Sequence, residues 1–263
     1  MDWRHFISRG VSEVFALRAI QQPSSGFRIL LYHSVGPRTM QNHYGLSVAS
    51  ERFRCQMTAL RDMPEVKTVP LEQYGRFASD GLCAGISFDD GYRNNLTQAA
   101  PILVELGLPF SVFIVPSYLD DSDHVYLTTR ELRELSAMPG CAIGSHTMTH
   151  QQLTHLDDAA LARELSDSRN WLEQQLGRQV TMLSYPHGSA DKRVRDAAAT
   201  VGYTLGVCSR TGINSFDRDP LLLCRTEIRA ADSVRFFQQK VLGSWDWHRL
   251  RHGDPAESAN VTP

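Results

Sequence analysis

The stretch Leu82–Gly91, LCAGISFDDG, decides how the rest of the chain is interpreted. Its first seven residues form a short apolar run, which is typical of a buried strand, and Asp89, Asp90 and Gly91 follow as a turn. Two adjacent aspartates on such a turn point in different directions, so one can bind a ligand while its neighbour does something else. We therefore expect a functional pair of carboxylates at the C-terminal end of this strand.

Similar short runs alternate with longer amphipathic stretches along the chain, which is the pattern of βα units around a parallel sheet. The predicted strands are 28–32, 82–88, 110–115, 142–144, 180–185, 204–207 and 222–224. The predicted helices are 51–62, 71–79, 94–106, 129–138, 158–176, 192–201 and 233–242. This number of units is too large for a compact sandwich, so we predict an α/β fold with a barrel-like sheet in a single domain, 26–243.

The composition is that of an ordinary globular protein. Of 263 residues, 42% are hydrophobic and 21% are charged, and the net charge of −2 gives no reason to expect nucleic acid as a partner. The five cysteines are odd in number and never form a CxxC pair, which favours a reducing compartment over a disulfide framework.

The two ends of the chain differ in pattern from its centre. Residues 1–25 carry apolar side chains at helical spacing, interrupted by arginines, so we predict an amphipathic helix that packs on the domain or contacts a membrane surface or partner. The first twenty residues lack the unbroken apolar stretch of a signal peptide or membrane span, which favours a cytoplasmic protein, with peripheral contact at the inner membrane face as the alternative. Residues 244–263 form a tail whose last ten or so positions we expect to be disordered.

Polar side chains follow several of the predicted strands. Asp89 and Asp90 end one strand, His146 follows another, Tyr185 and its successors end a third, and His33 follows the first. The C-terminal ends of parallel strands meet at one face of such a fold, so these residues are expected to converge there.

The segment His146–His150, HTMTH, supplies two histidines at i, i+4 spacing, which we expect to share one face of a helical turn. With a carboxylate oxygen they would form a three-ligand site with an open position, the catalytic kind of metal site. A lone Asp-Asp-Gly is more often a plain turn, and a lone HxxxH is more often a pair of surface or core histidines. Their joint occurrence at strand ends favours the metal site.

These motifs resemble those of the NodB-homology polysaccharide deacetylases, carbohydrate esterase family four. SFDDG matches the first family motif and HTMTH the second, LSYPHG resembles the third, and the resemblance runs from about residue 28 to about residue 229. It implies a distorted (β/α)7 barrel, with Asp89 as the catalytic base and Asp90, His146 and His150 as metal ligands. The metal implied is Zn²⁺, although the ligand set would also accept Co²⁺ or Ni²⁺.

The resemblance assigns the third motif to the oxyanion and the substrate. The backbone N–H of His187 would help to hold the oxyanion, and Tyr185 and Gly188 would complete the substrate-binding segment.

Two family positions are filled differently. Ser184 stands where the third motif often carries the arginine that pairs with the base, and Arg225 in LLLCRTEI resembles an arginine that could replace it, unless it is an ordinary surface arginine. The C-terminal Leu-x-His that supplies the general acid is also missing. His33 in YHSVG resembles the YH segment of bacterial poly-N-acetylglucosamine deacetylases and is the expected acid, with His187 or a satisfied core histidine as alternatives.

The expected function is metal-dependent removal of N-acetyl groups from hexosamine units of a saccharide or polysaccharide precursor. The alternatives are deacylation of O-acetyl, formyl or small cyclic amide substrates, and a non-catalytic carbohydrate-binding relic of the fold. A cytoplasmic location would favour an acetylated amino-sugar saccharide that is linked to a nucleotide or a lipid.

Overall fold

The computed structural model describes residues 25–37, 45–76 and 81–246. The predicted N-terminal helix, except for its last residue, and most of the predicted tail lie outside these ranges. No helix in the described part of the chain is long and apolar enough to cross a membrane.

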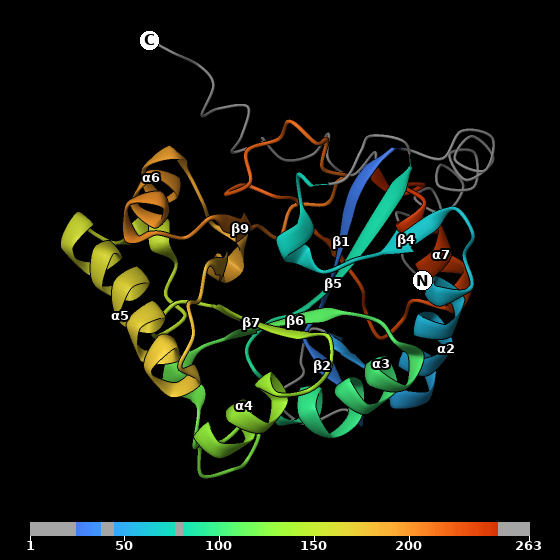
Figure 1. Ribbon diagram of the computed structural model, residues 1–263, viewed down its shortest axis with the longest axis horizontal. Helices are drawn as coiled ribbons and strands as arrows, with labels where there is room; N and C mark the ends of the chain where they lie inside the picture. Colours follow the sequence, from blue (N-terminus) through green and yellow to red (C-terminus); the bar gives the residue numbers. More distant parts are fainter. Residues whose placement is uncertain (1–24, 38–44, 77–80, 247–263) are drawn as a thin grey trace, which may run out of the picture.

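The core of the fold is a parallel sheet, with strand order β10-β1-β5-β6-β7-β8-β9 and β4 paired to β5 (Figure 1). Its strands are β1 Gly26–Tyr32, β4 Val66–Thr68, β5 Leu82–Phe88, β6 Phe110–Ile114, β7 Cys141–Ser145, β8 Met182–Ser184, β9 Leu205–Val207 and β10 Thr226–Glu227. All residues of β1 and β5 are buried, as expected of strands covered on both faces.

The sheet curves back towards its first strand and closes through the segment that leads into β10. Leu223 forms a parallel bridge with Val207 of β9, and three residues later Thr226 pairs with Leu30 of β1. The predicted barrel-like α/β fold is therefore confirmed, and the closure is irregular because one short segment serves both neighbours in turn.

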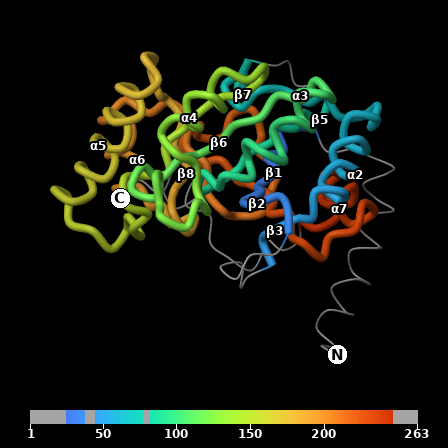
Figure 2. The backbone as a smooth tube through the Cα atoms, turned by 90° about the horizontal axis from the view of Figure 1, so that it is seen from below, coloured from blue at the N-terminus to red at the C-terminus, as the bar shows by residue number. Residues whose placement is uncertain are grey.

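Helices surround the sheet (Figures 1 and 2). They are α2 Ser50–Arg61, η2 Asn95–Ala99, α3 Ala100–Leu106, α4 Thr129–Ser136, α5 Asp158–Leu176, α6 Lys192–Val201 and α7 Val234–Val241, with the short turns η1 Leu71–Gln73, η3 Pro116–Tyr118, η4 Leu153–His155 and η5 Pro186–Gly188. Helices α2 and α7 lie side by side at one end of the molecule, and α5 and α6 at the other (Figure 2).

Local sequence signals set the ends of the longer helices. The side chain of Asp157 accepts a hydrogen bond from the N–H of Ala160 at the start of α5, and Gly177 ends that helix with φ 64°. Asp191 caps the start of α6 in the same way, and Gly202 ends that helix with a positive φ. These caps explain why both predicted helices have the observed bounds.

Several predictions about the elements were wrong. The helix predicted at 71–79 is reduced to the single turn η1, and residues 77–80 lie outside the description. The strand predicted at 222–224 contributes only the bridge at Leu223, because regular pairing with β1 begins at Thr226. Three short strands were missed, namely β4 and the separate pair β2 Ser34–Val35 and β3 Ser47–Val48.

Candidate active site

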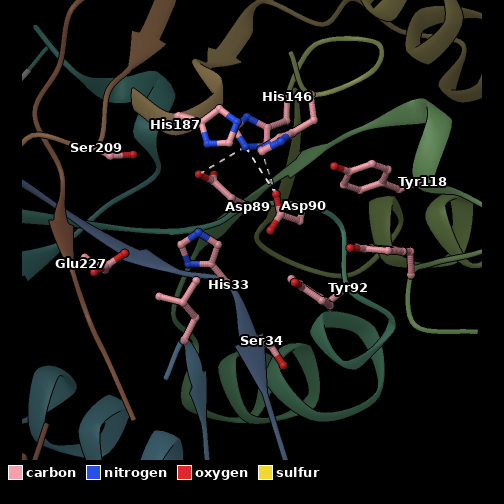
Figure 3. Close-up of a pocket in the computed structure, with 13 residues that line it drawn as sticks. His33, Ser34, Asp89, Asp90, Tyr92, Tyr118, His146, His187, Ser209 and Glu227 are labelled. Carbon is pink, nitrogen blue, oxygen red and sulfur yellow. Dashed lines mark ion pairs between the residues drawn. The ribbon is translucent and has the colours of Figure 1, made fainter. Parts of the chain in front are cut away.

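The predicted site residues gather at the C-terminal ends of the strands, around a cavity of about 470 Å³ (Figure 3). The cavity is lined by His33, Ser34, Leu46, Asp89, Asp90, Tyr92, Tyr118, Tyr126, His146, His150, His187, Ser209 and Glu227. Six of the nine residues predicted for the site are among them. Arg225, Tyr185 and Gly188 are not.

The turn after β5 separates the two aspartates. Asp90 has φ 73° and Gly91 has φ 71°, and a side chain at position 91 would approach Ile114 Cδ1 to 3.0 Å. The left-handed pair turns the chain sharply, so the Asp89 carboxylate is buried beneath the cavity while the Asp90 carboxylate is partly exposed within it.

Asp90, His146 and His150 form the one cluster of potential metal ligands found among the described residues. Asp90 Oδ1 lies 3.5 Å from Nε2 of each histidine. Ligand atoms at about 2.1 Å from a tetrahedral zinc ion are separated by roughly 3.4 Å, so the residues present fit a small divalent ion between them.

The histidine loop is not the helical turn that its spacing predicted. Residues 146–150 form an irregular loop in which Thr147 and His150 have φ near +60°. The buried carboxylate of Glu164 on α5 accepts hydrogen bonds from the N–H groups of Met148 and Thr149 at 2.9 Å each, and from the Thr149 hydroxyl at 2.5 Å. These bonds replace those that a helix would supply and hold the loop in shape.

Hydrogen bonds and burial leave both histidines in a state that could bind a metal ion. His146 Nδ1 lies 2.7 Å from the carbonyl of Ser184, so it carries the proton and donates, which leaves Nε2 free to face the carboxylates. Burial, followed by the nearby His146, lowers the pKa of His150 to about 4. His150 is therefore neutral near pH 7, the form that binds metal.

Arg225 is fully buried behind Asp89. It donates two hydrogen bonds to the Asp89 carboxylate, from Nη1 to Oδ1 at 2.7 Å and from Nη2 to Oδ2 at 2.6 Å. The Ser184 hydroxyl donates to Oδ2 of Asp89 at 3.1 Å and accepts from Nη2 of Arg225 at 2.9 Å. Burial alone would favour the neutral acid, but the charge and hydrogen bonds of Arg225 hold the pKa of Asp89 well below its usual range. Asp89 is thus ionised and can accept a proton.

His33 follows β1 and faces the same cavity, across from the metal-ligand cluster (Figure 3). Its Nδ1 is buried and has no hydrogen-bond partner among the residues that the structure describes. The side-chain amide of Asn95 holds the backbone of His33 by donating to its carbonyl at 2.8 Å.

The third-motif segment splits between the cavity and the core. The ring of His187 lies 4.7 Å from that of His150, and His187 itself has φ 57°. Tyr185 is fully buried and its hydroxyl donates to the carbonyl of Leu221 at 2.8 Å, while a side chain at Gly188 would collide with Ser209. Tyr185 and Gly188 therefore support the turn that presents His187, and their predicted part in substrate binding stays a prediction.

Sequence reasoning missed several residues of this site. Glu164 left a usable signal, because it is an acidic residue on the buried stripe of α5 that includes Leu161 and Leu165. Ser184 was noted in the sequence only as the residue that stands in place of the usual arginine. No signal marked the remaining lining residues, because isolated polar or aromatic residues outside a motif carry none; they are Tyr92, Tyr118, Tyr126, Ser209 and Glu227.

Comparison with known proteins agrees with this geometry. Residues 79–206 match the family model described as polysaccharide deacetylase. This segment is similar to the polysaccharide deacetylase family. The match includes Asp89, Asp90, His146, His150 and His187, whereas His33 and Arg225 lie outside it.

Individual proteins described as deacetylases are also similar to the chain. The chain is 29% identical over 204 residues to "Putative polysaccharide deacetylase YxkH" of Bacillus subtilis, covering 76% of this chain and 70% of that protein. It is 31% identical over 104 residues to a chitooligosaccharide deacetylase of Rhizobium leguminosarum bv. trifolii, covering 39% and 44%. The Streptococcus pyogenes deacetylase PplD, solved with acetate, superposes with a TM-score of 0.74 at 22% identity, over 84% of this chain and 99% of that one. The fold is therefore the distorted (β/α)7 barrel of these deacetylases.

Proposed function

We propose that this chain is a polysaccharide deacetylase, a metal-dependent hydrolase that removes N-acetyl groups from hexosamine units of a saccharide. The observation that carries the proposal is that Asp89, buried and ionised by its ion pair with Arg225, lies beside three residues suited to hold a divalent ion. Asp90, His146 and His150 are the proposed ligands and zinc is the proposed ion. A zinc ion held there would lower the pKa of a water molecule and polarise the acetyl carbonyl.

In the proposed reaction Asp89 accepts a proton from the water whose oxygen attacks the acetyl carbonyl carbon. The backbone N–H of His187 stabilises the resulting oxyanion. The carbon–nitrogen bond then breaks as His33 donates a proton to the departing nitrogen, which gives acetate and a free amine. Arg225 and Ser184 keep Asp89 ionised and oriented, and they do not touch the substrate.

His33 is proposed as the acid because its side chain faces the cavity beside Asp89 and its buried Nδ1 lacks a protein partner in the described structure. His187 is the competing candidate, since it also lines the cavity. His33→Ala should lower turnover at least a hundredfold with zinc content unchanged, whereas His187→Ala should have the smaller effect. Equal turnover of His33→Ala and the parent protein would exclude His33.

The test of the function is acetate release from N-acetylated chitooligosaccharides. We expect release that is abolished by a chelator and restored by zinc, and none from Asp89→Asn. An enzyme that releases acetate only from O-acetylated sugars, or that is fully active in chelator, would overturn the proposal.

Two sequence-based expectations about partners stay predictions. Membrane contact was assigned to the N-terminal helix, and residues 1–24 lie outside the description. A cytoplasmic, nucleotide- or lipid-linked substrate rests on the sequence pattern alone, and the binding comparison proposed below tests that linkage.

A further inference from the structure

Three tyrosines from separate segments form a row along one side of the cavity. The ring centroids of Tyr92 and Tyr126 are 5.0 Å apart, and those of Tyr126 and Tyr118 are 4.7 Å apart, with planes inclined by 30° and 37°. The row continues to His150, whose ring lies 5.8 Å from that of Tyr118. All three tyrosines line the cavity, and Figure 3 shows Tyr92 and Tyr118 beside the metal-ligand cluster.

Hydrogen bonds fix the backbone around Tyr92 and Tyr126. Tyr92 and Tyr126 form an antiparallel bridge, and the N–H of Arg93 donates to the carbonyl of Val125 at 2.9 Å. The carboxylate of Asp121 accepts the N–H groups of Val125 and Tyr126 at 3.1 and 3.0 Å. The phenol rings therefore stand on a preformed wall, which lowers the entropic cost of binding a ligand against them.

The phenol hydroxyls are neutral at physiological pH. The ordinary pKa of a phenol, about 10, is well above physiological pH. The hydroxyls of Tyr92 and Tyr126 are hydrogen-bonded to each other. In Figure 3 the hydroxyls of Tyr92 and Tyr118 point towards the centre of the cavity. This wall thus offers neutral groups that both donate and accept hydrogen bonds.

The charges of the cavity are equally informative. None of the described residues that line it is a lysine or an arginine. Glu227 lies on the other side of the aspartates from Tyr118 (Figure 3), and its carboxylate is paired with Arg229. Phosphate groups are usually bound by arginine or lysine, whereas sugar hydroxyls are suited to phenols, serine hydroxyls and carboxylates.

We propose that the row Tyr92, Tyr126 and Tyr118 is the wall against which the acetylated saccharide unit binds, and that the cavity selects uncharged saccharides over those that carry phosphate. This inference rests on the proposed function, because the bound unit must present its acetamido group to Asp89. It identifies Tyr126 as a specificity-determining residue, since Tyr126 lines the cavity and its ring packs between Tyr92 and Tyr118 rather than on a metal ligand.

The first test compares two substrates. The ratio of kcat/KM for N,N′,N″-triacetylchitotriose to that for 4-nitrophenyl acetate, which has no sugar, should fall about fivefold to tenfold in Tyr126→Phe and further in Tyr126→Ala. The control is Tyr74→Phe, because Tyr74 is also half-buried but its hydroxyl donates to the carbonyls of Ser215 and Arg218, away from the cavity. Its ratio should equal that of the parent protein. An unchanged ratio in both Tyr126 variants would overturn the inference, because damage to the fold alone lowers both rates together.

The second test measures binding to the chelator-treated full chain by calorimetry, so that turnover and metal–phosphate contacts do not contribute. Triacetylchitotriose should bind at least tenfold more tightly than uridine diphosphate N-acetylglucosamine, and Tyr126→Phe should weaken the first ligand only. Equal or tighter binding of the diphosphate sugar would overturn the selection for uncharged saccharides. If chitotriose binds as expected but no acetate is released, the proposed function fails and the role of the tyrosine row in binding stands. If acetate is released but substitution of Tyr126 has no effect, the proposed function stands and the role of the tyrosine row fails.

Discussion

Asp89 and Arg225, 136 residues apart in the chain, form a two-pronged ion pair in which neither side chain is more than 3% exposed. A buried ion pair is strongly destabilised when one partner is lost, because the other charge remains in a low-dielectric interior. Arg225→Met should therefore lower the free energy of unfolding by about 3–5 kcal/mol at pH 7, as measured by urea denaturation. The matched control is Arg54→Met, which breaks the exposed pair with Glu105 and should change stability little. Equal effects of the two substitutions would contradict this account.

The same pair predicts how activity depends on pH. The pKa of Asp89 is lower in the folded protein than in the unfolded chain, where it is about 3.9. Ionised Asp89 therefore stabilises the fold above about pH 3.9, and this stabilisation is lost as the pH falls towards the pKa of the folded protein. Ser184→Ala removes one hydrogen bond to the carboxylate, so the acid limb of the kcat/KM profile should move to higher pH, by up to about one unit, with kcat/KM reduced about tenfold. A rate profile that keeps the parent acid limb would show that Ser184 does not help to ionise the base.

Metal binding should depend on the three clustered residues and on no other nearby histidine. We expect one zinc ion per chain by mass spectrometry under native conditions, and loss of that ion in His146→Ala. His155→Ala is the matched control, since His155 is exposed on η4 and stands apart from the cluster. Zinc retained at full occupancy by His146→Ala would place the metal elsewhere.

Glu164 should tune the metal site without touching it. Glu164→Gln weakens the hydrogen bonds that hold Met148 and Thr149, so zinc affinity should fall about 10- to 100-fold in a competition assay with a chromogenic chelator. Glu173→Gln lies on the same helix, where Glu173 binds Arg169 and the N–H of Val180, and should leave zinc affinity unchanged. A similar loss in both variants would point to a general effect on α5.

His150 predicts acid sensitivity of the metal-free protein. Its folded pKa of about 4 lies below the unfolded value of about 6.5, so the unfolded chain takes up a proton first as pH falls. The contribution of His150 to stability is complete above about pH 6.5 and is lost as pH falls towards 4. His150→Gln should reduce this part of the pH dependence in denaturation experiments with chelator, and an unchanged dependence would contradict the assigned shift.

The sequence predicted the elements whose signals are local. The apolar run 82–88 and the capped helices 158–176 and 192–201 have the predicted bounds, because burial and capping act within a few residues. The helical turn expected at 146–150 was wrong because its backbone is set by Glu164, whose contact with the loop depends on tertiary packing. Strand β10 was shifted for a similar reason, since its pairing partners are decided by closure of the sheet.

The residues of the site also divide into those with a local sequence signal and those that only the fold brings together. Asp89, Asp90, His146 and His150 could be identified because each pair is close in sequence and follows a strand. Placing Arg225 beside Asp89 required a resemblance, and the structure now shows the contact. The tyrosine row could not be predicted, because its rings come from three separate segments that only the fold brings together.

The closure of the sheet has a consequence for how the active site is assembled. Arg225 lies between Leu223, which bridges to β9, and Thr226, which pairs with β1, so the residue that ionises Asp89 arrives only when the last strand joins the first. A fragment limited to residues 79–206 would keep the four motif residues but lack both Arg225 and His33. Closure of the sheet and ionisation of the base are thus one event, and a chain cut before Arg225 would carry the motifs without a working base.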